Sequence, residues 1–236
     1  MVFARLNGKI PATVARNIDI VCSEDPAQLL AEKLVDAVRA GGHIVLTGGN
    51  SVGVAYERAA ALEPDWTNVD IWFTDERCVP TDDERSNYRM IDERLFSRVR
   101  THRVHRMRGE LGKEQGATLY EQELGSLDRF DFVVLGLGSD GHVASLFPLQ
   151  PTLDITERKA VGAEAGLEPF VDRISLTLPM LRNAKEIVFF ATGDNKADAC
   201  VNAFDGEPSR ETPGSLVRAI RGATTALLDP AAAARV

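Results

Sequence analysis

The sequence predicts an α/β fold built on a mostly parallel sheet, and three observations support this prediction. Short runs of β-branched and aromatic residues alternate with segments of helical periodicity, which is typical of βα units. Glycine-rich or charged segments follow several of these runs. The length of 236 residues suits one α/β domain, and no stretch rich in Pro, Gly or Ser divides the chain. We therefore expect a single domain over residues 1–236.

The first helix is expected at residues 26–40, in PAQLLAEKLVDAVRA. Asp25 can cap this helix, Pro26 suits its first turn, and Gly41 ends it. The apolar residues that share one face are Leu30, Leu34 and Val38. A strand, HIVLT, follows at residues 43–47.

The remaining elements continue this alternation. Further strands are expected at residues 69–73, 102–107, 131–136, 173–178, 186–192 and 224–229. Further helices are expected near residues 51–62, 86–98, 114–124 and 195–204.

Composition excludes several classes of partner. The net charge of −8 and the pI of about 5.1 argue against nucleic acid or an anionic membrane, since both require a basic patch. An anionic substrate must then be attracted by a few placed cations. The chain has three cysteines, an odd number, and they are far apart in the sequence: Cys22, Cys78 and Cys200. We therefore expect inert thiols rather than disulfides or a zinc site. We find no signal peptide and no long apolar run, and expect a cytoplasmic protein.

Unusual residues follow four of the predicted strands. They are Thr47-Gly48-Gly49-Asn50, Thr74-Asp75-Glu76-Arg77, the segment from Gly136 to His142, and Gly193-Asp194-Asn195-Lys196. In an open parallel sheet, ligands bind at the carboxyl ends of the strands. The four segments therefore predict one site.

The segment from Gly136 to Gly141 spells G-x-G-x-x-G, the pattern of dinucleotide binding. That pattern requires a long helix after the glycines and an acidic residue about 20 positions further on. Pro148 and Pro151 end any helix soon after Gly141, and no suitably placed strand delivers the acid. A nucleotide site is therefore disfavoured.

His142 is the candidate general base. The glycines before it leave the backbone open to a ligand, and a free imidazole titrates at about pH 6.5. Packing of a turn is the alternative role. A nucleophilic triad of Asp140, His142 and Ser145 is disfavoured because the three residues crowd on one short turn. The histidines expected to pack or to lie at the surface are His43, His102 and His105.

Three other segments have the chemistry of ligand binding. Gly48-Gly49-Asn50, followed by Ser51 and a helix, resembles an anion cradle, although an ordinary tight turn has the same pattern. Asp75-Glu76-Arg77 can bind sugar hydroxyls and an oxyanion, or form a solvated strand end. Lys196 can place its ammonium on a phosphate, or lie free at the surface.

Taken together, these segments resemble the 6-phosphogluconolactonase family, within the larger group that includes the glucosamine-6-phosphate deaminases. The segment from Gly136 to Pro148 is similar to the family's G-x-G-x-D-G-H-T-A-S-L-F-P, with Val143 in place of threonine. Asp75 to Pro80, followed by Ser86-Asn87, resembles its D-E-R-x-V-P followed by S-N. Residues 172–197 resemble its R-I-T-L-T-x-P-x-L and G-x-x-K-A blocks. This chain departs from the family pattern at one loop. Where the family has G-G-S-T-P, residues 48–52 read GGNSV and lack the proline.

The resemblance implies a doubly wound, Rossmann-like sheet with helices on both faces. It also implies hydrolysis of 6-phospho-D-glucono-1,5-lactone to 6-phosphogluconate in the oxidative pentose phosphate pathway, a reaction that demands no metal and no organic cofactor. His142 would take a proton from water and return it to the ring oxygen, with Asp140 orienting that arrangement or the sugar. Arg77 and the backbone N–H groups of residues 138–141 would stabilise the oxyanion. The residues expected to bind the substrate or its phosphate are Gly48, Gly49, Asn50, Asp75, Gly138, Gly141, Arg173 and Lys196.

Three alternatives stay open. A deaminase of the glucosamine-6-phosphate type is disfavoured because S-L-F-P follows His142 where deaminases carry A-F-N-E. A nicotinamide-dependent oxidoreductase and a non-catalytic sugar-phosphate binding module are the other two. We expect a monomer or a small homo-oligomer whose only other partner is the small-molecule substrate.

Overall fold

The computed structural model of the chain describes residues 17–168 and 170–236. Its largest sheet contains β1 (Asp19–Cys22), β2 (Gly42–Leu46), β3 (Val69–Phe73), β5 (Phe130–Gly136), β8 (Ala184–Ala191) and β9 (Ala223–Leu228). The strand order is β1-β9-β8-β5-β2-β3, and all neighbouring strands run parallel. The prediction of an α/β fold with a mostly parallel sheet is confirmed.

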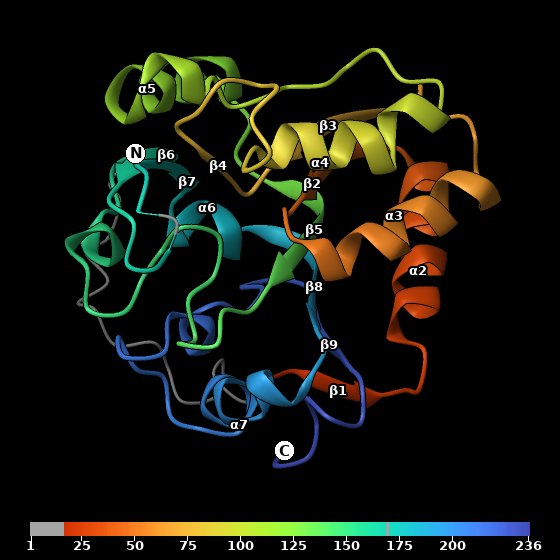
Figure 1. Cartoon of the computed structure of the whole chain (residues 1–236), viewed down its shortest axis with the longest axis vertical. Helices are drawn as coiled ribbons and strands as arrows, with labels where there is room; N and C mark the ends of the chain where they lie inside the picture. Colours follow the sequence, from red (N-terminus) through yellow and green to blue (C-terminus); the bar gives the residue numbers. More distant parts are fainter. Residues whose placement is uncertain (1–16, 169) are drawn as a thin grey trace.

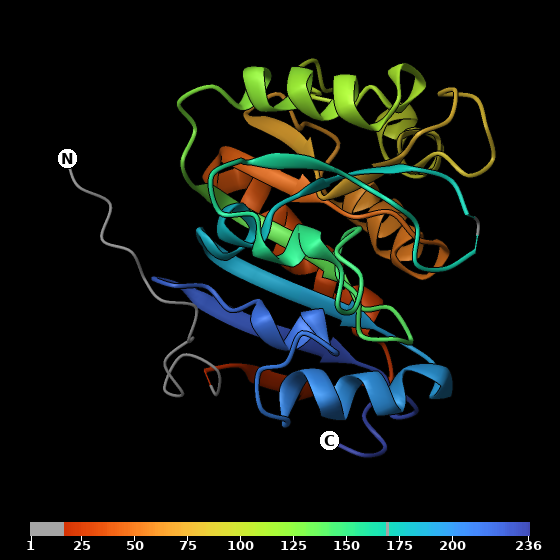
Figure 2. The ribbon, with the colours of Figure 1, turned by 90° about the vertical axis from the view of Figure 1, so that its left-hand side faces the viewer.

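Helices lie on both faces of this sheet (Figure 1, Figure 2). The α-helices are α2 (Pro26–Ala40), α3 (Asn50–Leu62), α4 (Asn87–Arg94), α5 (Lys113–Leu124), α6 (Leu178–Arg182) and α7 (Ala197–Phe204). The short 3₁₀ helices are η1 (Phe96–Arg98), η2 (Gly109–Leu111), η3 (Pro151–Asp154), η4 (Asp194–Lys196) and η5 (Pro213–Leu216). In Figure 1, α2 and α3 lie to the right of the central strands, and α6 lies to their left.

The start and end of α2 follow the residues that predict them. The Asp25 carboxylate accepts the N–H of Gln28 at 3.3 Å, and Pro26 occupies the first turn, where its missing N–H costs nothing. Gly41 ends the helix with a φ of 79°, which favours glycine. The predicted apolar face, Leu30, Leu34 and Val38, is buried.

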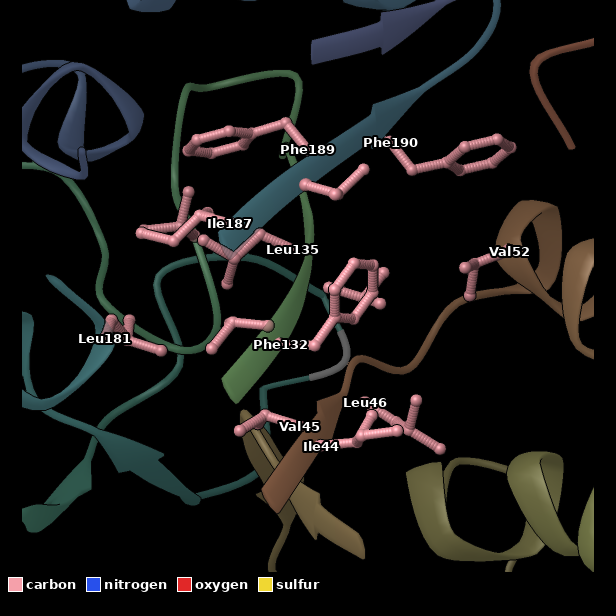
Figure 3. Packing of buried hydrophobic residues seen from close by; sticks show 14 of the residues in the cluster. Ile44, Val45, Leu46, Val52, Phe132, Leu135, Leu181, Ile187, Phe189 and Phe190 are labelled. Carbon is pink, nitrogen blue, oxygen red and sulfur yellow. The ribbon is translucent and has the colours of Figure 1, made fainter. Parts of the chain in front are cut away.

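The core lies on both faces of the large sheet (Figure 3). The central strands supply buried side chains that include Ile44, Val45, Leu46, Phe132, Leu135, Ile187, Phe189 and Phe190. Val52 of α3 and Leu181 of α6 approach these strands from opposite sides (Figure 3). Strands that are buried on both faces explain the nearly continuous apolar runs in the sequence.

A second sheet of three antiparallel strands has the order β4-β7-β6. Its strands are β4 (Asp75–Arg77), β7 (Arg173–Leu176) and β6 (Ala160–Ala163). The strand expected at residues 173–178 is therefore β7, and it is shorter than expected because Leu178 and Pro179 begin α6.

The strand expected at residues 102–107 is wrong. This segment makes a single bridge to the edge strand β3, between Val104 and Ile71. The N–H of Ile71 donates to the Arg103 carbonyl and the N–H of His105 donates to the Ile71 carbonyl, both at 2.8 Å. The segment therefore covers the edge of the sheet without extending it.

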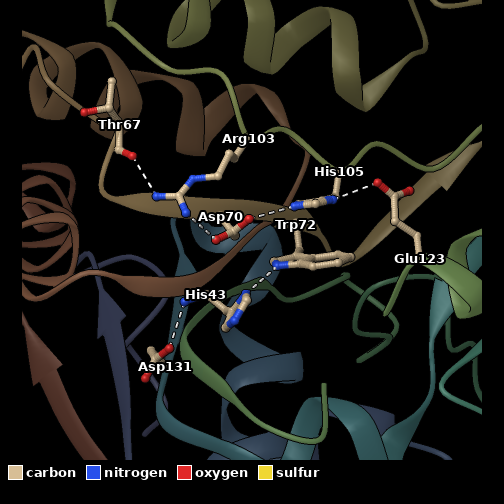
Figure 4. A network of polar contacts seen from close by, with 8 residues as sticks. All are labelled: His43, Thr67, Asp70, Trp72, Arg103, His105, Glu123 and Asp131. Carbon is tan, nitrogen blue, oxygen red and sulfur yellow. Dashed lines mark hydrogen bonds and ion pairs between the residues drawn. The ribbon is translucent and has the colours of Figure 1, made fainter. Parts of the chain in front are cut away.

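Side chains reinforce this edge at the amino-terminal ends of β2 and β3 (Figure 4). His105 lies between Asp70 at 2.9 Å and Glu123 of α5 at 2.7 Å, and its ring stacks on Trp72. The Trp72 indole N–H donates to His43 Nδ1 at 3.1 Å. His43 and His105 thus have the packing role expected of them, and His102 is exposed, as expected.

The three cysteines are free thiols. Burial raises the pKa of Cys78 and that of Cys200 to about 11, so both thiols stay protonated near neutral pH and inert. Cys22 is exposed. Within the described ranges, no helix is long and apolar enough to span a bilayer.

Candidate active site

The large sheet has a topological switch point between β2 and β5. From β2 the chain continues through α3 to β3 on one side, whereas from β5 it continues to β8 on the other side. Loops that leave such strands diverge, and ligands bind in the crevice between them. A cavity of about 260 Å³ lies at this point. The residues that line it are Thr47, Gly48, Gly49, Ser51, Asp75, Arg77, Asn87, Gly136, Leu137, Gly138, His142, Ala144, Phe190, Ala191, Thr192 and Lys196. All four predicted segments therefore meet at one edge of the sheet.

The loop from β2 to α3 requires glycine at two successive positions. A Cβ on Gly48 would lie 1.9 Å from Asn87 Oδ1, so only glycine allows this close approach. Gly49 precedes α3 with a φ of 122°, a conformation that L side chains rarely adopt. The loop thereby presents the first turn of α3, with its unpaired N–H groups and positive dipole end, to the cavity.

His142 is paired with Asp140 on the loop that follows β5. His142 Nδ1 lies 2.6 Å from Asp140 Oδ1, which also accepts the backbone N–H of His142 at 3.1 Å. Burial opposes the charge of Asp140, but the hydrogen bond and charge of His142 outweigh it, so the pKa of Asp140 lies below its ordinary value. Asp140 is therefore an anion that accepts from Nδ1–H and leaves Nε2 as the nitrogen able to take a proton.

Asp75 joins the His142 loop to the small sheet. It is buried, and its two carboxylate oxygens accept the hydroxyls of Thr74 at 2.8 Å and Ser145 at 2.7 Å. Ser145 therefore donates to a carboxylate and does not face His142 as a nucleophile would, which agrees with the expectation from its spacing.

Glu76 fixes the start of α4 beside the cavity. Its carboxylate accepts the backbone N–H groups of Arg77, Asn87 and Tyr88, each at 2.7 Å, and the Ser86 hydroxyl at 3.1 Å. Burial raises the pKa of Glu76, although these four donors favour its charged form. Asn87 is held in turn, because its side-chain amide donates to the Asp75 carbonyl at 2.9 Å.

The cavity is rich in cations although the whole chain is acidic. Arg77 and Lys196 line it together with His142, against the single carboxylate of Asp75. Burial lowers the pKa of Lys196, and the charge of Asp140 partly restores it. The cavity thus supplies the few placed cations that the composition requires of a protein with an anionic substrate.

Three expected binding residues lie outside the cavity lining. Asn50 is exposed at the start of α3, and its neighbour Ser51 lines the cavity instead. Gly141 is buried, with its carbonyl accepting the N–H of Gly214 at 2.8 Å. Arg173 is 4% exposed and pairs with Arg77 across β7 and β4, where burial and the charge of Arg77 lower its pKa. Arg173 therefore lies beside Arg77 on the small sheet and does not line the cavity.

Sequence reasoning assigned no role to several residues of the lining. Asn87 belongs to the Ser86-Asn87 pair of the family pattern. The pair alone does not indicate a role, because only the placement of α4 beside Gly48 brings Asn87 to the cavity. Phe190 and Ala191 end β8 and Thr192 follows it; all three are apolar or neutral, so no sequence signal distinguished them. Across residues 17–168 and 170–236, no group of three or more His, Cys, Asp or Glu side chains is placed to hold a metal ion.

Comparisons of sequence relate the chain to a known family. The profile of the family described as glucosamine-6-phosphate isomerases/6-phosphogluconolactonase matches residues 21–226. A 6-phosphogluconolactonase of Streptomyces coelicolor is 35% identical over 96% of this chain and 95% of its own length. A 6-phosphogluconolactonase of Haemophilus influenzae is 34% identical over 80% of this chain and 85% of its own length.

Comparisons of structure extend the likeness to the fold. A 6-phosphogluconolactonase of Thermotoga maritima has a TM-score of 0.81 and 28% identity, covering 90% of this chain and 99% of its own. A monomeric glucosamine-6-phosphate deaminase has a TM-score of 0.82 at 19% identity, covering 93% of this chain and 100% of its own, and so shares the fold alone. The chain belongs to the glucosamine-6-phosphate isomerase/6-phosphogluconolactonase family.

Proposed function

We propose that the protein hydrolyses 6-phospho-D-glucono-1,5-lactone to 6-phosphogluconate, a step of the oxidative pentose phosphate pathway. One observation carries the proposal: a histidine oriented by a carboxylate shares a cavity with two cations and the first turn of a helix. The sequence relatives named 6-phosphogluconolactonase, each about one-third identical to this chain, support the same substrate.

Hydrolysis of a lactone needs an activated water and a stabilised oxyanion. His142 Nε2 takes a proton from water while the water oxygen bonds to C1 of the lactone. The resulting oxyanion is stabilised by Arg77 and by backbone N–H groups of residues 138–141. When the bond from C1 to the ring oxygen breaks, His142 returns its proton to that oxygen. The ionised Asp140 stabilises the imidazolium between these two steps.

The phosphate aligns the reacting end of the substrate. The first turn of α3 offers N–H groups and a positive dipole end, and Lys196 offers an ammonium. These contacts are far along the sugar from C1, so their binding energy serves to orient the lactone against His142. Asp75, whose oxygens face the Thr74 and Ser145 hydroxyls, has remaining lone pairs for a sugar hydroxyl.

The test is hydrolysis of freshly prepared lactone by the purified protein, with the spontaneous rate subtracted. We expect a rate well above the spontaneous one, no ammonia from glucosamine 6-phosphate, and no binding of NADP. Ammonia release would establish the deaminase activity instead. Binding of 6-phosphogluconate without turnover of the lactone would establish a non-catalytic binding module.

The reaction also fits the bulk properties of the chain. We place the enzyme in the cytoplasm as one domain, acting as a monomer or small homo-oligomer without nucleic acid or membrane partners. Its acidic surface repels polyanions, whereas its cavity attracts one small anion.

A further inference from the structure

We propose that Ser145 is a positioning residue that holds the His142 turn against the small sheet. The inference rests on the proposed function, because it concerns the placing of the base in that reaction. Ser145 is 1% exposed and lies three residues after His142. It neither lines the cavity nor contacts the imidazole, so its effect on catalysis passes through the groups it holds, the turn and the Asp75 carboxylate.

Ser145 binds both members of one cross-strand pair. Asp75 of β4 and Ser175 of β7 stand opposite each other in the antiparallel ladder. The Ser145 hydroxyl donates to Asp75 Oδ2 at 2.7 Å, and its backbone N–H donates to the Ser175 hydroxyl oxygen at 3.2 Å. The Ser175 hydroxyl donates to the Leu176 carbonyl at 3.0 Å, which turns its lone pairs toward Ser145. The loop after β5 is thereby attached to both strands.

The backbone between His142 and Ser145 adopts a disfavoured conformation. Val143 and Leu146 form a bridge, and the Leu146 N–H donates to the Val143 carbonyl at 2.9 Å. Within this tight turn, Ala144 has a φ of 49°, in the left-handed region that favours glycine. Such a residue persists only where its surroundings over-determine it, often at functional sites. The two hydrogen bonds of Ser145 directly follow Ala144 and supply that constraint.

The turn is therefore held by hydrogen bonds on both sides of the His142 side chain. Before it, the Gly138 N–H donates to the His142 carbonyl at 2.8 Å, and Asp140 holds the ring. After it, Ser145 holds the turn on β4, the strand that carries Arg77. Loss of the Ser145 hydroxyl lets Ala144 relax and His142 move relative to Arg77, while the phosphate contacts on α3 and η4 stay in place.

The kinetic test compares Ser145→Ala with Ser126→Ala, a control at an exposed serine beside the opposite edge of the sheet. We expect kcat for the lactone to fall about 10-fold to 100-fold in Ser145→Ala, since small misplacements of a base cost this much. The affinity and stoichiometry for 6-phosphogluconate, measured by calorimetry, should stay near wild type, which shows that the site is folded. A kcat close to wild type in Ser145→Ala would overturn the proposal.

Two further measurements separate positioning from a loss of stability. Adding Ala144→Gly to Ser145→Ala should recover part of kcat, because glycine adopts the left-handed conformation without strain. The imidazole NMR signals, readily assigned with four histidines in the chain, should shift for His142 in Ser145→Ala but not in Ser126→Ala. An unmoved His142 signal would overturn the positioning role even if kcat fell. This signal can be read without turnover, so a wild type inactive on the lactone would contradict the proposed function separately.

Discussion

At the level of single residues, the 2.6 Å contact between His142 Nδ1 and Asp140 decides which ring nitrogen can act as a base. The sequence predicted both residues but assigned Asp140 only a general orienting role. In the structure the Asp140 carboxylate lies against Nδ1, so in the proposed mechanism it accepts Nδ1–H and Nε2 is the nitrogen that takes the proton from water. Their spacing along the chain could not predict this, since it depends on how the loop turns at Gly141.

Replacing Asp140 by Asn should therefore impair His142 as a base without weakening substrate binding. The asparagine amide can donate to Nδ1, which favours the tautomer with its proton on Nε2. We expect kcat to fall at least about 100-fold, as is typical when a general base is lost, with KM nearly unchanged. Steady-state kinetics measure this, with Asp36→Asn on the exposed face of α2 as control. A larger effect on KM than on kcat would contradict this role.

Lys196 should act on the phosphate alone. Replacing it by Met removes one charge-assisted contact, so we expect KM for the phosphorylated lactone to rise about 10-fold or more. The variant Lys196→Arg keeps the charge and should lie between Met and wild type. For glucono-1,5-lactone without a phosphate, Lys196→Met should make little difference to kcat/KM. An equal loss on both lactones would place Lys196 at the reacting end.

At the level of elements, the sequence predicted those strands and helices whose apolar pattern is set by burial. The strands around Val45, Val133 and Val188 are buried on both faces and have unbroken apolar runs. The strands β1, β4 and β6 were not predicted, because they are short and because exposure, charge or small residues conceal their pattern. Asp75 and Glu76 of β4 can be buried because groups outside the strand satisfy them: the Ser145 hydroxyl donates to Asp75 and the Asn87 N–H donates to Glu76.

The convergence of four loops could be predicted from the sequence, because parallel strands present their carboxyl ends at one edge. The position of individual side chains could not. Arg173 begins a strand as expected, but the antiparallel pairing of β7 with β4 places it beside Arg77 and away from the cavity lining. Asn87 reaches the cavity because Glu76 fixes the start of α4.

The loop between β2 and α3 should not tolerate a side chain at its first glycine. In Gly48→Ala, the new Cβ would lie 1.9 Å from Asn87 Oδ1, so the loop or α4 must move. We expect the free energy of unfolding to fall by about 1–3 kcal/mol, typical of overpacking, together with a loss of kcat/KM. Urea unfolding measures the change in the free energy of unfolding. In an Asn87→Ala background the cost should shrink, because the clashing group is gone. Additive effects of the two substitutions would contradict this contact.

At the level of the whole molecule, folded-state charges make stability depend on pH. The carboxyls whose pKa is lowered by folding are Asp25, Glu57, Asp65, Asp83, Glu110, Asp131 and Asp140. Hydrogen bonds and charges from nearby Arg, Lys, His or Thr residues outweigh their desolvation. Such groups stabilise the fold fully above their unfolded pKa values of 3.8 for Asp and 4.5 for Glu, and this stability is lost as pH falls through the lower folded values.

We therefore expect the free energy of unfolding to decrease as pH falls below about 4.5. Glu76 changes the stability in the opposite direction, because its raised pKa lets the folded state bind a proton before the unfolded state does. It is a single group, whereas several carboxyls have a lowered pKa, so the decrease should prevail. Urea unfolding at constant ionic strength measures the trend. Because each of these carboxyls is exposed or half-buried and none is fully buried, added salt should flatten the decrease in stability. Constant or increasing stability on acidification would contradict the assignment of these ion pairs.

In the proposed function, this family member is a lactone hydrolase and His142 is its general base. The measurement that tests it most directly is hydrolysis of fresh 6-phospho-D-glucono-1,5-lactone by His142→Ala beside wild type and the exposed-site control His102→Ala. We expect wild type and His102→Ala to exceed the spontaneous rate, and His142→Ala to lose about 100-fold or more of that excess. If His142→Ala kept most of the wild-type rate, His142 would not be the base.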